Sequence, residues 1–132
     1  MTINPGGSET TPLVLVVDDD VTACALAQAY LQLEGYRVKT AVNGVDALVL
    51  LQDCVPCAMV VDLRMPRMDG VELRRQQLTM AAVANVPFIL MSASAELQET
   101  AEMLSASDVL VKPFDHEELK AAIEHACSAG PP

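Results

Sequence analysis

Acidic and basic side chains directly follow three apolar segments of this chain of 132 residues. Asp62 follows one segment, Asp18 and Asp19 follow another, and Lys112 follows the last. If these segments are parallel strands of one sheet, the side chains meet at the edge where ligands bind in open α/β folds. Three crowded carboxylates repel one another and raise the pKa of at least one of them. They become compatible around a hard divalent cation, and Mg²⁺ prefers such oxygen ligands.

A cation held by carboxylates beside a lysine and a hydroxyl is typical of a phosphate site. The cation and the ammonium group of Lys112 would neutralise phosphoryl oxygens, and the hydroxyl of Ser92 would donate one hydrogen bond. Asp62 is then placed as the attacking carboxylate, which predicts an aspartyl phosphate. The sequence contains no Gly-rich phosphate loop or nucleotide motif, so the donor must bring its own phosphoryl group.

Alternating strand and helix patterns position these side chains. Continuous apolar runs predict strands buried on both faces, and apolar residues at helical spacing predict the helices between them. The strands are expected at residues 13–17, 36–41, 57–61, 86–91 and 108–111, and the helices at about 20–34, 43–53, 69–82, 95–105 and 115–127. Right-handed crossovers then predict an α/β fold with a doubly wound, five-stranded parallel sheet in the order 2-1-3-4-5.

The chain is acidic, with 8 Lys and Arg against 18 Asp and Glu and a formal charge of −10. Nucleic acids and anionic membranes require a basic surface, so neither is expected as a partner. The sequence shows neither a signal peptide nor an apolar run long enough to span a bilayer, which predicts a cytoplasmic protein. One domain is expected at residues 12–128, with a flexible tail at 1–11 and a short tail at 129–132.

Cysteines, histidines and a pair of arginines have simple structural interpretations. The spacing Cys54-Val55-Pro56-Cys57 resembles a redox pair or half of a zinc site, but no helix start follows it and no matching ligand pair is evident. We therefore interpret all four cysteines as small apolar thiols in a reducing compartment. Both histidines, and Arg74 with Arg75, are expected on solvated helix faces.

The chain resembles the receiver domains of two-component response regulators over about residues 12–127. The resemblance rests on Val16-Val17-Asp18-Asp19, on Asp62 with Met65-Pro66 and Met68-Asp69-Gly70, on Ser92-Ala93, and on Lys112-Pro113-Phe114. Each motif alone is weakly specific, whereas all four in this order and at this spacing are highly specific. A flavodoxin-like fold is what the resemblance implies.

The resemblance also implies a role for each matched residue. Asp62 would accept a phosphoryl group from a histidine kinase or phosphotransfer protein, and Asp18 and Asp19 would bind Mg²⁺ with it. The backbone carbonyl of Arg64 would be a further metal ligand. Ser92 and Lys112 would contact the phosphoryl group, and the Lys112-Pro113 bond would be cis. The protein would then be a phosphorylated signalling domain, not an enzyme, and would act on a downstream protein target.

The chain departs from the family at several positions, of which Val109 matters most. A Tyr or Phe usually stands there and its rotation reports phosphorylation, whereas valine is short and stiff. Any switch is then expected to run through Ser94, Ala95 and Glu96 and the helix that follows. Ser105 replaces a frequent glycine, and Ala58 replaces an acid common in the third strand.

Two other functions remain open on the sequence alone. Asp18-x-Asp20-x-Thr22 also fits the nucleophile motif of haloacid-dehalogenase-like phosphatases, although the later acidic motif of that family is missing and Asp62 is left unexplained. The second alternative is a pseudo-receiver that docks without being phosphorylated. The favoured reading is a stand-alone receiver, or a receiver cut from a longer chain.

Overall fold

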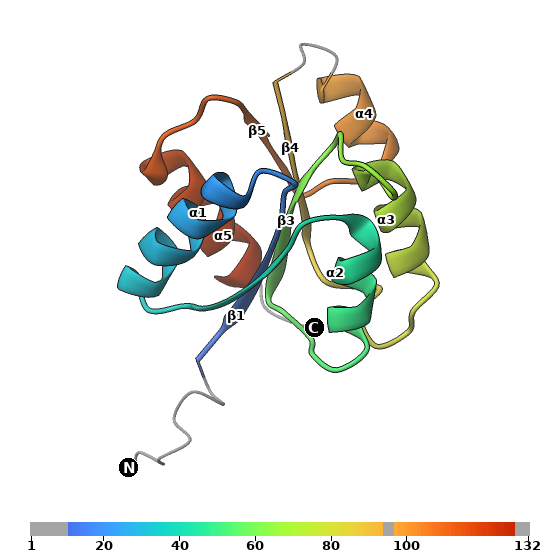
Figure 1. The fold of residues 1–132 in the computed structure, drawn as a ribbon, viewed down its shortest axis with the longest axis horizontal. Coiled ribbons are helices and arrows are strands. Elements are labelled where there is room, and N and C mark those ends of the chain that lie inside the picture. The colour runs from blue at the N-terminus through green and yellow to red at the C-terminus, as the bar shows by residue number, and fades with distance from the viewer. Residues whose placement is uncertain (1–10, 94–96, 129–132) are drawn as a thin grey trace.

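The computed structural model describes residues 11–93 and 97–128. Its five strands form one parallel sheet in the order β2-β1-β3-β4-β5, so the predicted fold class is confirmed. Figure 1 shows α1 and α5 on one face of this sheet and α2, α3 and α4 on the other. In chain order the elements are β1 (Leu13–Val17), α1 (Val21–Leu33), β2 (Arg37–Ala41), α2 (Gly44–Leu51), β3 (Ala58–Asp62), α3 (Gly70–Leu78), β4 (Phe88–Ser92), α4 (Leu97–Met103), β5 (Asp108–Val111) and α5 (His116–Ser128).

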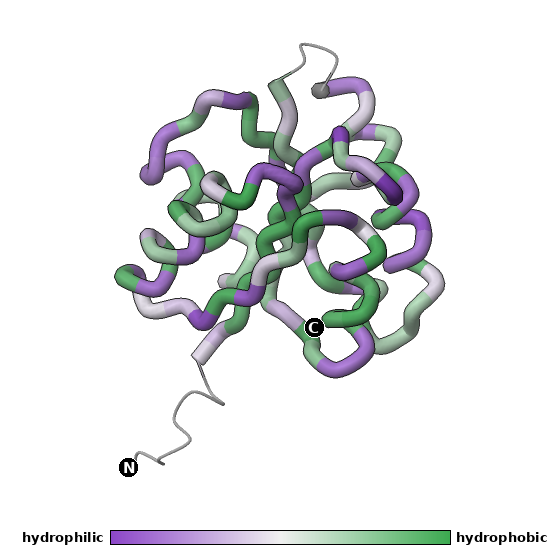
Figure 2. The backbone as a smooth tube through the Cα atoms, in the orientation of Figure 1, coloured by the Kyte–Doolittle hydropathy of each residue, from purple (hydrophilic) through white to green (hydrophobic). Residues whose placement is uncertain are grey.

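Two aliphatic cores fill the space between the sheet and its helices. Successive residues of a strand point to opposite faces, so Leu15 and Val17 enter one core while Val14 and Val16 enter the other. Every residue of β1, β3 and β4 is buried, as expected for central strands covered on both sides. Figure 2 shows this interior as a hydrophobic centre with hydrophilic segments around it.

Polar side chains define the helix starts. The Asp20 carboxylate accepts hydrogen bonds from the N–H groups of Thr22 and Ala23 at the start of α1, as predicted. At the start of α5, Asp115 and Glu118 each accept the other's backbone N–H, a capping box. Gly35 follows α1 with φ +99°, a conformation that ends helices and favours glycine.

Three helices end earlier than the sequence predicted, and the first of them is α2, which ends at Leu51 and not near residue 53. α3 stops at Leu78 and not near residue 82, because the hydroxyl of Thr79 donates to the Gln76 carbonyl and a turn follows. The buried amide of Gln77 holds that turn through the carbonyls of Val83 and Val86. α4 stops at Met103 because Ser105 adopts a φ of 55°. The predicted start of this helix at residue 95 lies outside the described residues. Of the two predicted tails, only Thr11 is described.

The prediction of a solvated Arg74 is wrong. Its guanidinium is buried, lies over the Phe88 ring, and donates hydrogen bonds to the carbonyls of Leu104 and Ser105 and to Gln77. The charge of Arg74 favoured a solvated side chain, and the two carbonyls that allow its burial lie about thirty residues away in the turn after α4. Arg75 is exposed as predicted, as are both histidines, although His116 stacks on the Tyr30 ring.

The interpretation of all four cysteines as free thiols is also wrong. Cys57 and Cys127 form a disulfide across 70 positions of sequence. Packing of α5 against the sheet brings their Cα atoms to 5.1 Å, a distance typical of disulfides and one that sequence spacing does not reveal. Cys24 and Cys54 are free, as predicted. Among the described residues, no helix is long and apolar enough to cross a membrane.

Candidate functional site

The strand register places the three predicted groups at one edge of the sheet. Val17 of β1 pairs with Val61 of β3, and Asp18 and Asp62 are the next residues along their chains. Ser92 is the last residue of β4 and pairs with Val111, the residue before Lys112. The carboxyl ends of β1, β3, β4 and β5 therefore deliver acids, a hydroxyl and an amine to a common rim.

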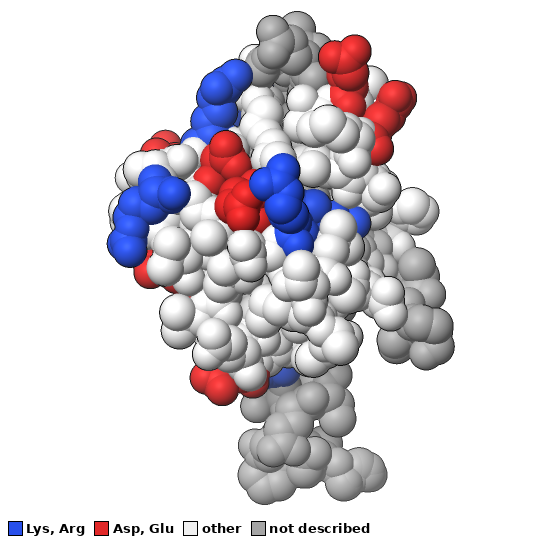
Figure 3. All heavy atoms as spheres, turned by 90° about the vertical axis from the view of Figure 1, so that its right-hand side faces the viewer, with Lys and Arg blue, Asp and Glu red and all other residues white. Residues whose placement is uncertain are grey.

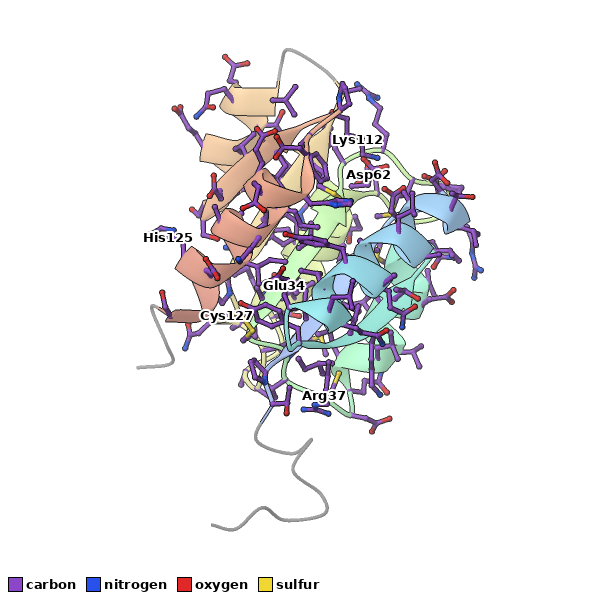
Figure 4. All side chains as sticks on the ribbon, turned by 90° about the vertical axis from the view of Figure 1, so that its left-hand side faces the viewer. Glu34, Arg37, Asp62, Lys112, His125 and Cys127 are labelled. Carbon is purple, nitrogen blue, oxygen red and sulfur yellow. A yellow bond between two sulfur atoms is a disulfide. The ribbon has the colours of Figure 1, made fainter. Side chains whose placement is uncertain are left out.

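Lys112 lies between the two buried carboxylates. Its Nζ atom is 2.9 Å from Asp18 Oδ2 and 3.5 Å from Asp62 Oδ1. The lysine side chain keeps about a third of its surface exposed, whereas only 3% of the Asp18 side chain and 12% of the Asp62 side chain are exposed. Figure 4 shows Asp62 and Lys112 together at one end of the molecule. One ammonium group thus faces two shielded negative charges.

Asp19 completes the acidic cluster. It is exposed, and one carboxylate oxygen from each of Asp18, Asp19 and Asp62 lies within 4.8 Å of the others. Two hydrogen bonds fix the position of Asp18: its Oδ1 accepts the backbone N–H of Asp20 at 2.9 Å, and its own backbone N–H donates to the carbonyl of Ala41. In Figure 3, acidic side chains gather toward the upper end of the view with basic side chains beside them.

The electrostatics follow from burial and crowding. The pKa of Asp62 rises from 3.8 to about 6, chiefly because the carboxyl is buried and then because Asp18 is near; Lys112 opposes the rise. Burial lowers the pKa of Lys112, but its hydrogen bond to Asp18 and the charges of Asp18 and Asp62 outweigh burial and raise it. A raised carboxyl pKa is what the crowding of acids predicted.

The loop after Asp62 is folded tightly against the strand end. Arg67 has a φ of 70°, and the N–H of Met68 donates to the Pro66 carbonyl at 2.8 Å, a γ-turn pattern. Arg64 lies in this loop with an exposed side chain. The sequence predicted a turn made by Pro66 and Gly70, whereas the positive φ belongs to Arg67.

Gly70 has a role that the sequence analysis missed. A Cβ atom at this position would lie 2.9 Å from the backbone carbonyl oxygen of Asp62 and 3.1 Å from the Cα of Leu63. Backbone cannot move aside as the end of a side chain can, so only glycine fits here without displacing the strand end. In the sequence, Gly70 after Met68-Asp69 indicated a turn, but it did not indicate that the backbone of Asp62 and Leu63 lies this close to it.

Ser92 and the segment after β5 close the site. Ser92 is 3% exposed, and its carbonyl accepts the backbone N–H of Lys112 at 2.9 Å. The Lys112-Pro113 bond is cis, as the resemblance implied. Cys24 lies beneath the site and was also missed, since the sequence analysis interpreted it only as a small apolar thiol; its thiol donates to the Asp18 carbonyl at 3.2 Å.

Comparison with known proteins identifies the family. A family model described as the response regulator receiver domain matches residues 14–124. The chain therefore belongs to the receiver domains of two-component response regulators.

Relatives of known name are longer than this chain. It is 36% identical over 115 residues to the transcriptional regulatory protein ZraR of Klebsiella oxytoca, covering 86% of this chain and 26% of ZraR. It is 39% identical over 118 residues to the transcriptional regulatory protein PrrA of Mycobacterium tuberculosis, covering 87% of this chain and 49% of PrrA. The chain thus spans between about a quarter and a half of these relatives.

Solved structures show the same fold. The chemotaxis response regulator CheY4 of Vibrio cholerae has a TM-score of 0.82 and 27% identity, over 88% of this chain and 98% of that one. The receiver domain of the sensor histidine kinase PA1611 from Pseudomonas aeruginosa has a TM-score of 0.81 and 26% identity, over 89% and 98% of the two chains. That second structure contains a magnesium ion coordinated in its active-site cleft.

Proposed function

We propose that Asp62 accepts a phosphoryl group from a histidine kinase or a histidine phosphotransfer protein and that the resulting change in shape is read by a downstream protein. The observation that carries this proposal is the single lysine between two buried carboxylates at the carboxyl edge of the sheet. The charge of Lys112 does not balance these acids, so the edge can accept a cation together with a phosphoryl group.

The acidic cluster fits Mg²⁺ by the chemistry of its donors. Asp18, Asp19 and Asp62 offer three hard oxygen ligands within 4.8 Å of one another, and Lys112 alone does not balance their charge. We assign these three carboxylates, with the backbone carbonyl of Arg64, as the groups that would hold the ion. When bound, Mg²⁺ would neutralise negative charge on the phosphoryl oxygens.

Asp62 supplies the nucleophile. A carboxylate oxygen of Asp62 attacks the phosphorus atom, the P–N bond of the donor phosphohistidine breaks, and its electron pair returns to the imidazole ring. Lys112, held 2.9 Å from Asp18, can pair with a phosphoryl oxygen, and the buried Ser92 can donate its hydroxyl to another. Hydrolysis later breaks the same O–P bond: water attacks phosphorus, and the Asp62 carboxylate is restored with release of inorganic phosphate.

The geometry of Asp20 disfavours the phosphatase alternative. That reading needs Asp20, the second acid of Asp18-x-Asp20-x-Thr22, to face the reacting group. Its carboxylate instead accepts the N–H groups of Thr22 and Ala23 as the cap of α1. An Asp20 engaged in this way is a structural residue.

The output route differs from that of receivers with an aromatic at the position of Val109. Val109 is partly buried and packs against the core beneath α4, next to a surface cleft of about 420 Å³ between α4 and β5. We infer that Val109 moves little on phosphorylation and that the segment after Ser92 carries the change. Ser94, Ala95 and Glu96, which the sequence analysis named for this motion, lie outside the described residues.

The partner, boundaries and location are part of the same proposal. We place the receiver at residues 12–128, with residues 1–11 and 129–132 outside it, in a cytoplasmic protein. The relatives named as transcriptional regulatory proteins are longer than this chain, and we do not assign the activity of such a whole protein to the receiver. That the receiver itself binds neither nucleic acid nor membrane stays a prediction from its charge of −10.

Labelling from radioactive acetyl phosphate with Mg²⁺ tests the proposal. Wild type is expected to incorporate acid-stable, base-labile label, and Asp62→Asn to incorporate none because the amide cannot attack. Asp53→Asn is the matched control, since Asp53 is exposed in the turn before β3, at the opposite end of that strand from Asp62, and it should label like wild type.

Two further measurements separate the alternatives. Label that persists in Asp62→Asn and vanishes in Asp18→Asn would overturn the proposal in favour of the phosphatase. Absence of both label and a beryllofluoride adduct in wild type would overturn it in favour of a docking module. Amide chemical shifts with and without beryllofluoride test the route: large changes confined to Val109 and α5 would contradict the output through α4.

A further inference from the structure

The disulfide between Cys57 and Cys127 joins two elements far from the phosphate site. Cys57 immediately precedes β3, and its backbone N–H donates to the Leu13 carbonyl at 2.7 Å, so it is fixed to the sheet. Cys127 lies in the last turn of α5. Figure 4 shows Cys127 in the lower part of the view, away from Asp62 and Lys112 near the top.

The last turn of α5 depends on this bond for much of its attachment. Upstream, Leu119, Ala122 and Ile123 are buried against the sheet. In the last turn the buried side chain is the small Ala126, whereas residues 124, 125 and 128 are exposed. Little apolar area is removed from water by one alanine, so the covalent link is the main constraint on this turn.

One of the two cysteines lies in a surface cleft. Cys127 lines a surface cleft of about 620 Å³, together with Pro12, Tyr36 and His125. Cys57 is not among the residues that line this cleft. Both cysteines keep part of their surface exposed, and a thiol that enters this cleft from solvent reaches Cys127.

We propose that Cys57 and Cys127 form a reversible redox clamp, opened by dithiol reductants at Cys127, that controls how firmly the end of α5 is attached to β3. A thiolate of the reductant attacks Cys127 Sγ, the S–S bond breaks, and Cys57 leaves as a thiolate. The second thiolate of the reductant then attacks its own sulfur in the mixed disulfide and releases the Cys127 thiolate. The reductant becomes a disulfide, the protein gains two electrons, and two protons complete the two thiols.

Re-formation of the clamp needs a small disulfide such as oxidised glutathione. The Cys127 thiolate attacks it and releases one glutathione thiolate; the Cys57 thiolate then attacks Cys127 Sγ and releases the second. In cytosolic proteins disulfides are mostly transient and redox-sensing. For a protein expected in the cytoplasm, a disulfide with an accessible sulfur is of this kind.

Thiol counting and peptide mapping test the clamp in the full chain. Four cysteines with one disulfide leave two titratable thiols after denaturation, Cys24 and Cys54. After equilibration with oxidised glutathione the count is expected to be two, with a Cys57–Cys127 linked peptide, and after a dithiol reductant it should be four. A count of four under oxidation, or a Cys54–Cys57 linkage, would overturn the proposal.

Thermal unfolding and hydrogen exchange test what the clamp does. Reduction removes a cross-link over 70 positions and is expected to lower Tm by roughly 10 °C. Amide exchange should rise in residues 124–128 while β3 keeps its protection. Cys127→Ser should match reduced wild type and ignore reductant, whereas Cys54→Ser, the control, should keep the shift. Unchanged Tm and exchange on reduction of wild type would overturn the role of the clamp, whether or not the variants fold.

Single thiols test which sulfur is attacked. In a Cys54→Ser background, Cys57→Ala leaves Cys127 and Cys127→Ala leaves Cys57 as the thiol near the cleft. We expect Cys127 to form a mixed disulfide with oxidised glutathione at least about tenfold faster than Cys57. Equal rates, or a faster Cys57, would overturn the assignment of Cys127 as the point of entry.

Discussion

The raised pKa of Asp62 has a consequence for stability that one substitution can expose. The unfolded chain releases the carboxyl proton near pH 3.8, whereas the folded chain holds it until about pH 6. Between these values the folded state binds more protons than the unfolded state, so the free energy of unfolding falls as pH rises. Above pH 6 the full cost of ionising a buried, crowded carboxyl is present.

The size of the effect follows from the same interval. At about 1.4 kcal/mol for each pH unit, the interval from 3.8 to about 6 corresponds to roughly 3 kcal/mol. Asp62→Asn never ionises and avoids this cost, but it also loses the contact with Lys112 Nζ at 3.5 Å. We therefore expect the metal-free variant to be more stable than wild type by about 1–3 kcal/mol at pH 7.5, and by close to zero at pH 4.5.

Urea unfolding in EDTA at the two pH values measures the difference. Asp53→Asn is the control, because an exposed carboxyl should give a small difference that does not change with pH. Saturating Mg²⁺ should erase the advantage of Asp62→Asn, since the ion stabilises wild type through the ionised carboxylate. The reasoning would be refuted if Asp62→Asn were less stable than wild type at pH 7.5. It would also be refuted if the difference in the free energy of unfolding were the same at both pH values.

Three other predictions concern the metal, the turn and the buried arginine. Mg²⁺ at ten times its dissociation constant should add about 1.4 kcal/mol to wild type, and less to Asp19→Ala; a melt indifferent to Mg²⁺ would argue against a carboxylate site. Gly70→Ala should cost about 1–3 kcal/mol and slow labelling, because its Cβ would lie 2.9 Å from the Asp62 carbonyl oxygen; normal stability and labelling would contradict this. Arg74→Met should cost about 2–4 kcal/mol in urea unfolding by leaving carbonyls unpaired, while substitution of its exposed neighbour, Arg75→Met, should cost under about 0.5 kcal/mol; equal losses would contradict a stabilising role for the Arg74 hydrogen bonds.

The sheet and the candidate site were predictable because both follow from local pattern plus a topological rule. Apolar runs of five residues indicate strands covered on both faces, and the helices between them make those strands parallel. The carboxyl ends of parallel strands share one edge, so the positions of Asp18, Asp62 and Lys112 in the sequence were enough to predict that they meet. The bounds of β1 and β5 were predicted to the residue.

Tertiary structure decided what depends on partners distant in sequence. Arg74 lies on the buried face of α3 with Leu73 and Gln77, and only the packing of the turn after α4 over it provides the carbonyls that allow a charged side chain to be buried there. Cys57 and Cys127 are joined only because α5 packs against β3, which no spacing between them expresses. Only glycine fits at position 70 because the backbone of Asp62 and Leu63 lies so close to it. The pKa of Asp62 is raised by burial as well as by the charge of Asp18. Sequence periodicity reports which face of an element is apolar; which atoms meet that face is set by how the whole chain packs.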